Sequence, residues 1–136
     1  MKISFTAVAL DKPSRDLLMT RVERFIPEGW KTRAGHMTIT TGPLVHPRGK
    51  HDFSNDFSLN GEVSLKVLKI GLDERALAVV VDTPGRVASG FAHITIAISP
   101  ESKPRHSKEI PEENFTPFSE DEGTLTLKGI VKEFPF

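Results

Sequence analysis

Two short segments of the sequence carry nearly the same residues in the same order, AGHMTIT at 34–40 and FAHITIA at 91–97. Each places a histidine, a hydrophobic residue, a threonine and a second hydrophobic residue in succession. Because side chains of a β-strand point alternately to its two faces, each segment predicts a strand with an apolar stripe on one face. The opposite face then carries the histidine and the threonine. The stripe explains packing on a core, whereas the repeated polar pair needs a separate explanation.

The rest of the sequence predicts four further strands and one helix. The strand segments are rich in β-branched and alternating apolar residues, and they comprise 3–10, 62–72, 74–82 and 124–134. The turn LDER predicts a hairpin between the second and third of these. Pro13 suits the first turn of a helix, and the apolar residues after it recur at helical spacing until PEGW at 27–30. These apolar residues are Leu17, Leu18, Val22, Phe25 and Ile26.

Three segments predict connections between the strands. Residues 44–61 are full of turn formers and predict a polar connection, and 82–90 predict a loop. Residues 100–123 contain several prolines and many charges, which predicts a surface excursion with at most one short helical turn. The expected fold is therefore α+β with a mostly antiparallel sheet, in one domain spanning 1–136.

Composition limits the function. The 136 residues are 38% hydrophobic and 26% charged, which suits one globular domain. Eighteen basic residues balance eighteen acidic ones, so a long nucleic-acid footprint and a membrane-surface role are not expected. There is no cysteine, no signal-peptide pattern and no apolar run of membrane-spanning length. We expect a cytoplasmic monomer.

Two imidazoles and two hydroxyls facing one cleft would suit phosphodiester hydrolysis. The imidazole pKa lies near 6.5, so one ring can donate a proton while the other accepts one. His36 and His93 are therefore the candidate general acid and base, with the order left open. Thr38 and Thr95, two residues after each histidine, can donate hydrogen bonds to the non-bridging phosphate oxygens. No metal or other cofactor is required.

HMTI and HITI resemble the two Hx(T/S)x motifs of the 2H phosphoesterases. FTAVALDKPSRDLL and AHITIAISPESKPRHSKEI resemble segments of members related to the cyclic-phosphodiesterase domains of tRNA ligases and RNA-repair proteins, and LKGIVKEF resembles the closing strand there. The resemblance implies a compact, pseudo-symmetric, two-lobed fold and the opening of a 2',3'-cyclic phosphate by water, most often to a 2'-phosphate. The expected substrate is an RNA 3' end or a small cyclic nucleotide.

Further residues are weaker candidates. Arg33 and Arg86 precede the two motifs and could each bind phosphate, and Ser107 follows a basic loop as it does in relatives. Loop aromatics could stack a base, and the sequence does not choose among Trp30, Phe53, Phe57, Phe115 and Phe118. His46, His51 and Asp52 lack a fourth ligand at a recognisable spacing, so no metal site is expected.

Two alternatives remain beside the enzyme. A non-catalytic module could keep the cleft to bind an RNA end or a nucleotide. In a small β-rich interaction domain, both histidines would be structural. An enzyme should show a bell-shaped pH profile and turnover in EDTA, and a binding module should bind its ligand without turnover. In an interaction domain, His36→Ala or His93→Ala should affect only stability.

Overall fold

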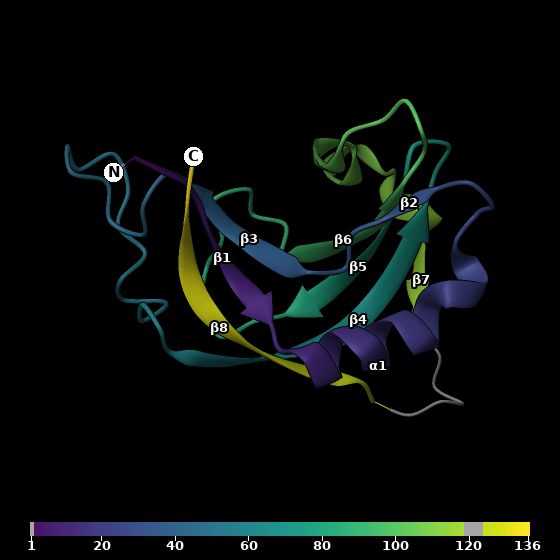
Figure 1. Ribbon diagram of the computed structural model, residues 1–136, viewed down its shortest axis with the longest axis horizontal. Coiled ribbons are helices and arrows are strands. Elements are labelled where there is room, and N and C mark those ends of the chain that lie inside the picture. Colours follow the sequence, from purple (N-terminus) through teal and green to yellow (C-terminus); the bar gives the residue numbers. More distant parts are fainter. Residues whose placement is uncertain (1, 119–123) are drawn as a thin grey trace.

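A curved antiparallel sheet is the main feature of the computed structural model, which describes residues 2–118 and 124–136 (Figure 1). Every pairing between its named strands is antiparallel, and one α-helix, α1 (Lys12–Val22), accompanies the sheet in the described residues. The α+β class with a mostly antiparallel sheet is thus confirmed. The strands are β1 (Ile3–Leu10), β2 (Lys31–Thr32), β3 (His36–Thr41), β4 (Glu62–Leu72), β5 (Ala76–Asp82), β6 (His93–Ile98), β7 (Phe115–Pro117) and β8 (Thr126–Pro135).

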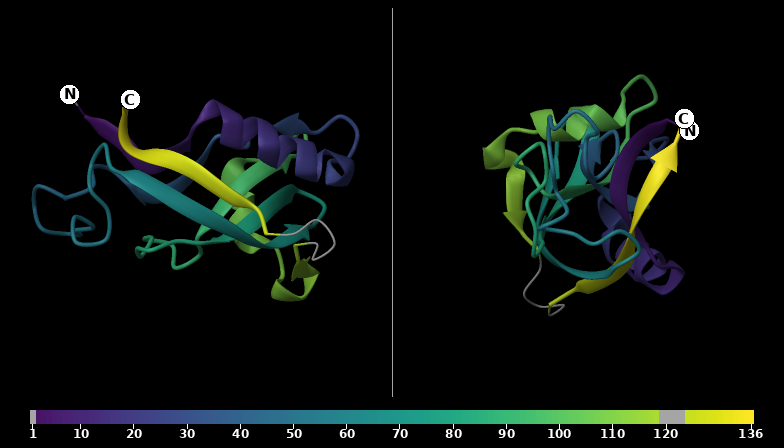
Figure 2. Two further views of the ribbon diagram at one scale, coloured as in Figure 1. Left: turned by 90° about the horizontal axis from the view of Figure 1, so that it is seen from below. Right: turned by 90° about the vertical axis from the view of Figure 1, so that its left-hand side faces the viewer.

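The order of the strands brings the two repeated motifs together. The sheet runs β2-β6-β5-β4-β8-β1-β3, and β7 pairs with β4 off this path. One edge of the long strand β4 is shared, because β8 pairs with residues 62–66 and β7 with residues 69–71. The sheet curls strongly, as the end-on view in Figure 2 shows. As a result β3, at one end of the path, contacts β6, which lies near the other end.

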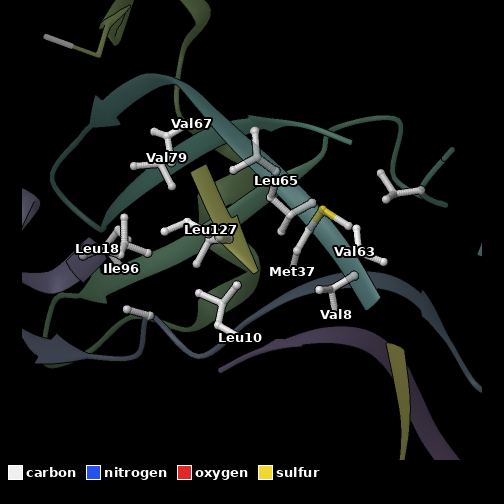
Figure 3. Packing of buried hydrophobic residues seen from close by; sticks show 14 of the residues in the cluster. Val8, Leu10, Leu18, Met37, Val63, Leu65, Val67, Val79, Ile96 and Leu127 are labelled. Carbon is white, nitrogen blue, oxygen red and sulfur yellow. The ribbon is translucent and has the colours of Figure 1, made fainter. Parts of the chain in front are cut away.

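Hydrophobic side chains fill the interior of the curled sheet (Figure 3). On β4 the alternation is as predicted, because Val63, Leu65 and Val67 are buried and the pattern slips at Leu68, which is 39% exposed. On β1 the alternation is lost at Thr6, Ala7 and Val8, all fully buried. Burying so many side chains between the strands provides the main driving force for folding.

Helix α1 packs against β8 and closes one side of the core. Asp11 caps its N-terminus by accepting a hydrogen bond from the backbone N–H of Ser14 at 2.8 Å. Leu18 and Val22 are fully buried, but the helix is shorter than the apolar spacing predicts. After Val22 the chain tightens into a 3₁₀ turn (Glu23–Phe25), which leaves Phe25 partly exposed. No helix in the described part of the chain is both long and apolar enough to cross a membrane.

The segment expected to be a surface excursion is more ordered than the sequence predicts. It contains two 3₁₀ helices, Pro104–Glu109 and Glu112–Asn114, followed by β7, whereas the sequence predicts at most one short helical turn. Its residues 119–123 lie outside the described residues. The expectation of six strands is also wrong, because β2 and β7 are too short to produce an alternating pattern and β7 ends on a proline. In the connection 44–61, only the isolated bridge between Val45 and Asp52 forms β-structure.

Leu65→Ala should destabilise the fold by about 2–5 kcal/mol, because it leaves a cavity beneath the centre of the sheet. Leu65 is fully buried, whereas Leu68 on the same strand is 39% exposed and provides a matched control. Leu68→Ala should change the free energy of unfolding by less than about 1 kcal/mol. Urea unfolding measures both. Equal effects of the two variants would contradict this description of the core.

Candidate active site

A cavity of about 600 Å³ lies where β3 and β6 meet, and both repeated motifs line it. His36 and Thr38 come from β3, and His93 and Thr95 come from β6. The intervening residues face the core, as the alternation predicts, because Met37 and Ile94 are fully buried. Both histidine rings are only partly buried and remain accessible from the cavity.

A β-bulge occurs at the same position of each motif. In β3, Thr38 and Thr40 pair with the consecutive residues Ala7 and Thr6 of β1, so Ile39 is the extra residue. In β6, Thr95 and Ala97 pair with the consecutive residues Ala78 and Leu77 of β5, which makes Ile96 the extra residue. A bulge bends its strand and frees the backbone groups of the extra residue from the regular ladder.

Each of the two freed carbonyls accepts a hydrogen bond from the segment that precedes the other motif. The backbone N–H of Arg33, just before the first motif, donates to the Ile96 carbonyl at 2.7 Å. The backbone N–H of Ala88, just before the second motif, donates to the Ile39 carbonyl, also at 2.7 Å. Strand β6 is therefore hydrogen-bonded to the segment before β3, and β3 to the segment before β6. These reciprocal hydrogen bonds fix the distance between the two histidine-bearing strands.

His93 has a defined tautomer. Its Nδ1 lies 2.7 Å from the Phe91 carbonyl oxygen, and because a carbonyl only accepts, Nδ1 carries the proton and Nε2 is left for the cavity. The ring also stacks on the Phe91 ring, with centroids 4.5 Å apart. Burial lowers the pKa of His93 below its ordinary value, the bond to Phe91 opposes this by raising it, and the charge of Lys108 lowers it further.

His36 lies in a less polar environment. It packs near Phe5, with ring centroids 5.2 Å apart, and no hydrogen bond of its ring occurs within the described residues. Burial lowers the pKa of His36, and the charges of Arg33 and His93 lower it further. The effect of His93 means that the two imidazoles are close enough for the charge on one ring to disfavour a charge on the other.

The two motif threonines differ in their surroundings. Thr38 is exposed to the cavity, whereas the Oγ1 of Thr95 shares a hydrogen bond with the Oγ of Ser107 at 2.8 Å. Ser107 is fully buried and is not among the residues that line the cavity. It therefore lies behind Thr95, where it orients the threonine hydroxyl, and does not face a ligand directly.

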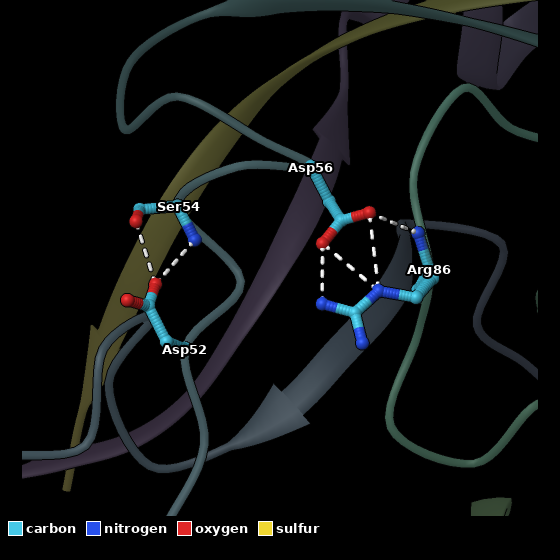
Figure 4. A network of polar contacts seen from close by, with 4 residues as sticks. All are labelled: Asp52, Ser54, Asp56 and Arg86. Atoms are coloured by element: carbon cyan, nitrogen blue, oxygen red, sulfur yellow. Dashed lines mark hydrogen bonds and ion pairs between the residues drawn. The ribbon is translucent and has the colours of Figure 1, made fainter. Parts of the chain in front are cut away.

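Of the two candidate arginines, only Arg33 lines the cavity. Arg86 forms an ion pair with Asp56 at 2.8 Å and packs over the Phe53 ring, as Figure 4 shows for the pair. Neighbouring Asp52 accepts hydrogen bonds from Ser54 instead. The ion pair of Arg86 thus links the loop before the second motif to the polar connection 44–61.

Several residues that line the cavity belong to no recognisable motif of the sequence. Arg105 and Lys108 line the cavity from the 3₁₀ helix Pro104–Glu109, where they flank Ser107. Phe5 also lines it. The five aromatics considered for base stacking, which are Trp30, Phe53, Phe57, Phe115 and Phe118, are all absent from its lining. The one sequence feature that could have indicated Arg105 and Lys108 is their position on either side of the candidate Ser107.

The histidines of the connection 44–61 do not form a metal centre with their neighbours. His46 and His51 lie with ring centroids 5.4 Å apart, but the Nε2 of His51 bonds the Pro43 carbonyl. Within residues 2–118 and 124–136, no three histidine, aspartate or glutamate side chains are arranged to bind a metal ion.

Comparison with known proteins adds no further assignment. The chain matches no family model, and no curated protein matches its sequence. Functional inference therefore depends on the residues and the geometry of the cavity.

Both motif histidines should titrate below pH 6.5, their ordinary pKa, because burial disfavours the charged rings. The unfolded chain then binds protons that the folded chain does not, so stability is complete above about pH 6.5 and falls as the pH drops below it. NMR titration of the ring protons measures the two pKa values. The double variant His36→Asn/His93→Asn should lose less stability on acidification than the wild type. A pKa above 6.5 for both rings would contradict this.

Proposed function

We propose that the protein is a metal-independent phosphodiesterase that opens 2',3'-cyclic phosphates, at RNA 3' ends or on small cyclic nucleotides, to 2'-phosphates. One observation carries the proposal. Two imidazoles from strands far apart in the sequence line one cavity together with two threonines and Arg33, and no carboxylate of residues 2–118 or 124–136 lines it. Such a cavity attracts an anion and offers both an acceptor and a donor of protons.

The reaction needs one proton removed and one supplied. A neutral imidazole takes a proton from water as its oxygen attacks phosphorus, and a protonated imidazole gives a proton to the ribose 3'-oxygen as its bond to phosphorus breaks. Arg33, Thr38 and Thr95 line the same cavity, which supports a role for their side chains in stabilising charge on the non-bridging oxygens. After the reaction the first ring holds an extra proton and the second has lost one, and proton exchange with solvent restores both.

The environments of the two rings favour different roles. The Phe91 carbonyl stabilises the protonated form of His93, whereas His36 has no such bond and lies near Arg33. His93 therefore suits the general acid and His36 the general base. This assignment depends on the hydrogen bond as well as on the charges around each ring.

The arrangement of the strands supports a two-lobed fold like that of the 2H phosphoesterases. The path divides into β3-β1-β8 and β6-β5-β4, and in each half the motif strand is paired with its neighbour through a bulge at the same motif position. Two halves related in this way would bring equivalent histidines to one phosphorus. The balanced net charge suits a compact ligand better than a long polyanion.

His36→Ala and His93→Ala should each lower kcat/KM for a nucleoside 2',3'-cyclic phosphate by at least about 100-fold, because each removes one proton transfer. His46→Ala, at a histidine outside the cavity, is the control and should leave turnover unchanged. The assay contains EDTA and identifies the product by chromatography. Binding without turnover in the wild type would indicate a nucleotide-binding module instead.

The pH profile of kcat/KM should be bell-shaped with its maximum below pH 6.5, because the pKa values of both free-enzyme histidines are lowered from 6.5. His36→Ala should remove the acidic limb, which reports the base. His93→Ala should remove the alkaline limb, which reports the acid. The reverse pattern would exchange the two roles.

A substrate with sulfur in place of the 3'-oxygen tests the roles independently. A thiolate leaves without protonation because its pKa is about 8.5, well below that of an alcohol. The loss caused by His93→Ala should therefore shrink by about tenfold or more on this substrate, while the loss caused by His36→Ala should persist. Equal losses on both substrates would contradict His93 as the acid.

A further inference from the structure

The cavity carries more positive charge than one cyclic phosphate requires. A cyclic phosphodiester bears a single negative charge, whereas Arg33, Arg105 and Lys108 all line the cavity, where the described part of the chain contributes no carboxylate. None of these three side chains forms an ion pair or hydrogen bond within the described residues. We infer that Arg105 and Lys108 form a second anion subsite, which binds another phosphate of the same substrate. This inference rests on the proposed function.

The position of the two residues is fixed by the buried serine between them. Ser107 is fully buried and shares its hydrogen bond with Thr95 on the motif strand β6. This contact attaches the 3₁₀ helix Pro104–Glu109 to the second motif, and its exposed neighbours Arg105 and Lys108 are thereby held at the cavity. Lys108 lowers the pKa of His93, whereas Arg33 lowers that of His36, so the two cations lie near different rings of the cavity.

The nearest acidic residue of this segment is engaged elsewhere. Glu109 follows Lys108 directly, but its carboxylate lies 3.3 Å from Arg75 and 3.9 Å from His106. It therefore does not neutralise Lys108. Arg33 lies near His36 instead, where it suits the reacting phosphate. The two basic residues next to Ser107 are left for a different anionic group.

A phosphate on the 5' side of the reacting ribose has the required chemistry. A cavity of about 600 Å³ is in the range that encloses a whole nucleotide, so it exceeds the needs of a cyclic phosphate alone. The second phosphate has two sources, the terminal 5'-phosphate of a small nucleotide or the backbone phosphodiester of an RNA chain. Arginine and lysine bind either group through charge-assisted hydrogen bonds.

The test compares three substrates, namely cytidine 2',3'-cyclic phosphate, its 5'-phosphorylated form, and a dinucleotide ending in the same cyclic phosphate. The wild type should show a kcat/KM at least about tenfold higher for one or both of the extended substrates, since each charge-assisted contact contributes about a factor of ten. Arg105→Ala/Lys108→Ala should bring this ratio close to one. Preference for the 5'-phosphate or for the dinucleotide distinguishes the two sources.

The control variant Arg48→Ala/Lys50→Ala removes the same charges from an exposed loop outside the cavity lining and should preserve the ratio. Calorimetric binding of cytidine 2',5'-bisphosphate and cytidine 2'-phosphate gives a readout independent of turnover. Preference for the bisphosphate that disappears in Arg105→Ala/Lys108→Ala supports the subsite even if no substrate is hydrolysed, in which case the proposed function fails alone. No preference in the wild type, or a preference that survives the double variant, overturns the subsite while leaving hydrolysis of the simple cyclic phosphate intact.

Discussion

Two reciprocal backbone hydrogen bonds, together with the pairing of β2 and β6, join the two ends of the curled sheet. The carbonyls of Ile39 and Ile96 are freed by matching bulges, and each accepts from the segment that precedes the opposite motif. Buried backbone groups must find partners, so these bonds satisfy the bulges and at the same time join the two ends of the sheet. Without this closure, His36 and His93 would lie on strands separated by the width of the sheet.

Closure also sets the electrostatics of the site. Bringing the two rings into one partly buried cavity removes water from both and lowers both pKa values, and the charge of His93 lowers the pKa of His36 further. The Phe91 carbonyl then breaks the equivalence by holding His93 in one tautomer. A structurally symmetric pair of motifs thus becomes a chemically asymmetric pair of imidazoles, which is what acid–base catalysis in one direction requires.

The sequence predicts local features of this site and misses those that depend on distant partners. Alternation correctly assigns the core-facing residues Met37, Ile39, Ile94 and Ile96, because it depends on strand geometry alone. Beyond the bulge in β6 it fails, because Ala97 packs in the main core and Ile98 in a separate cluster. The bulges and closing bonds have no local signal, since register is set by pairing between strands. Arg86 precedes the second motif much as Arg33 precedes the first, yet a remote partner, Asp56, takes it away from the cavity. Lys108 is brought in only by the burial of Ser107.

The central claim is that His36 and His93 bind one phosphate together. Titration of the ¹⁵N-histidine-labelled protein with a nucleoside 2'-monophosphate, followed by the ring nitrogen resonances, tests it most directly. The account predicts that the Nε2 resonance of His93 and a ring nitrogen of His36 shift along curves that give one dissociation constant, while those of His46 do not move. Shifts confined to one of the two rings, or two unrelated dissociation constants, would contradict it.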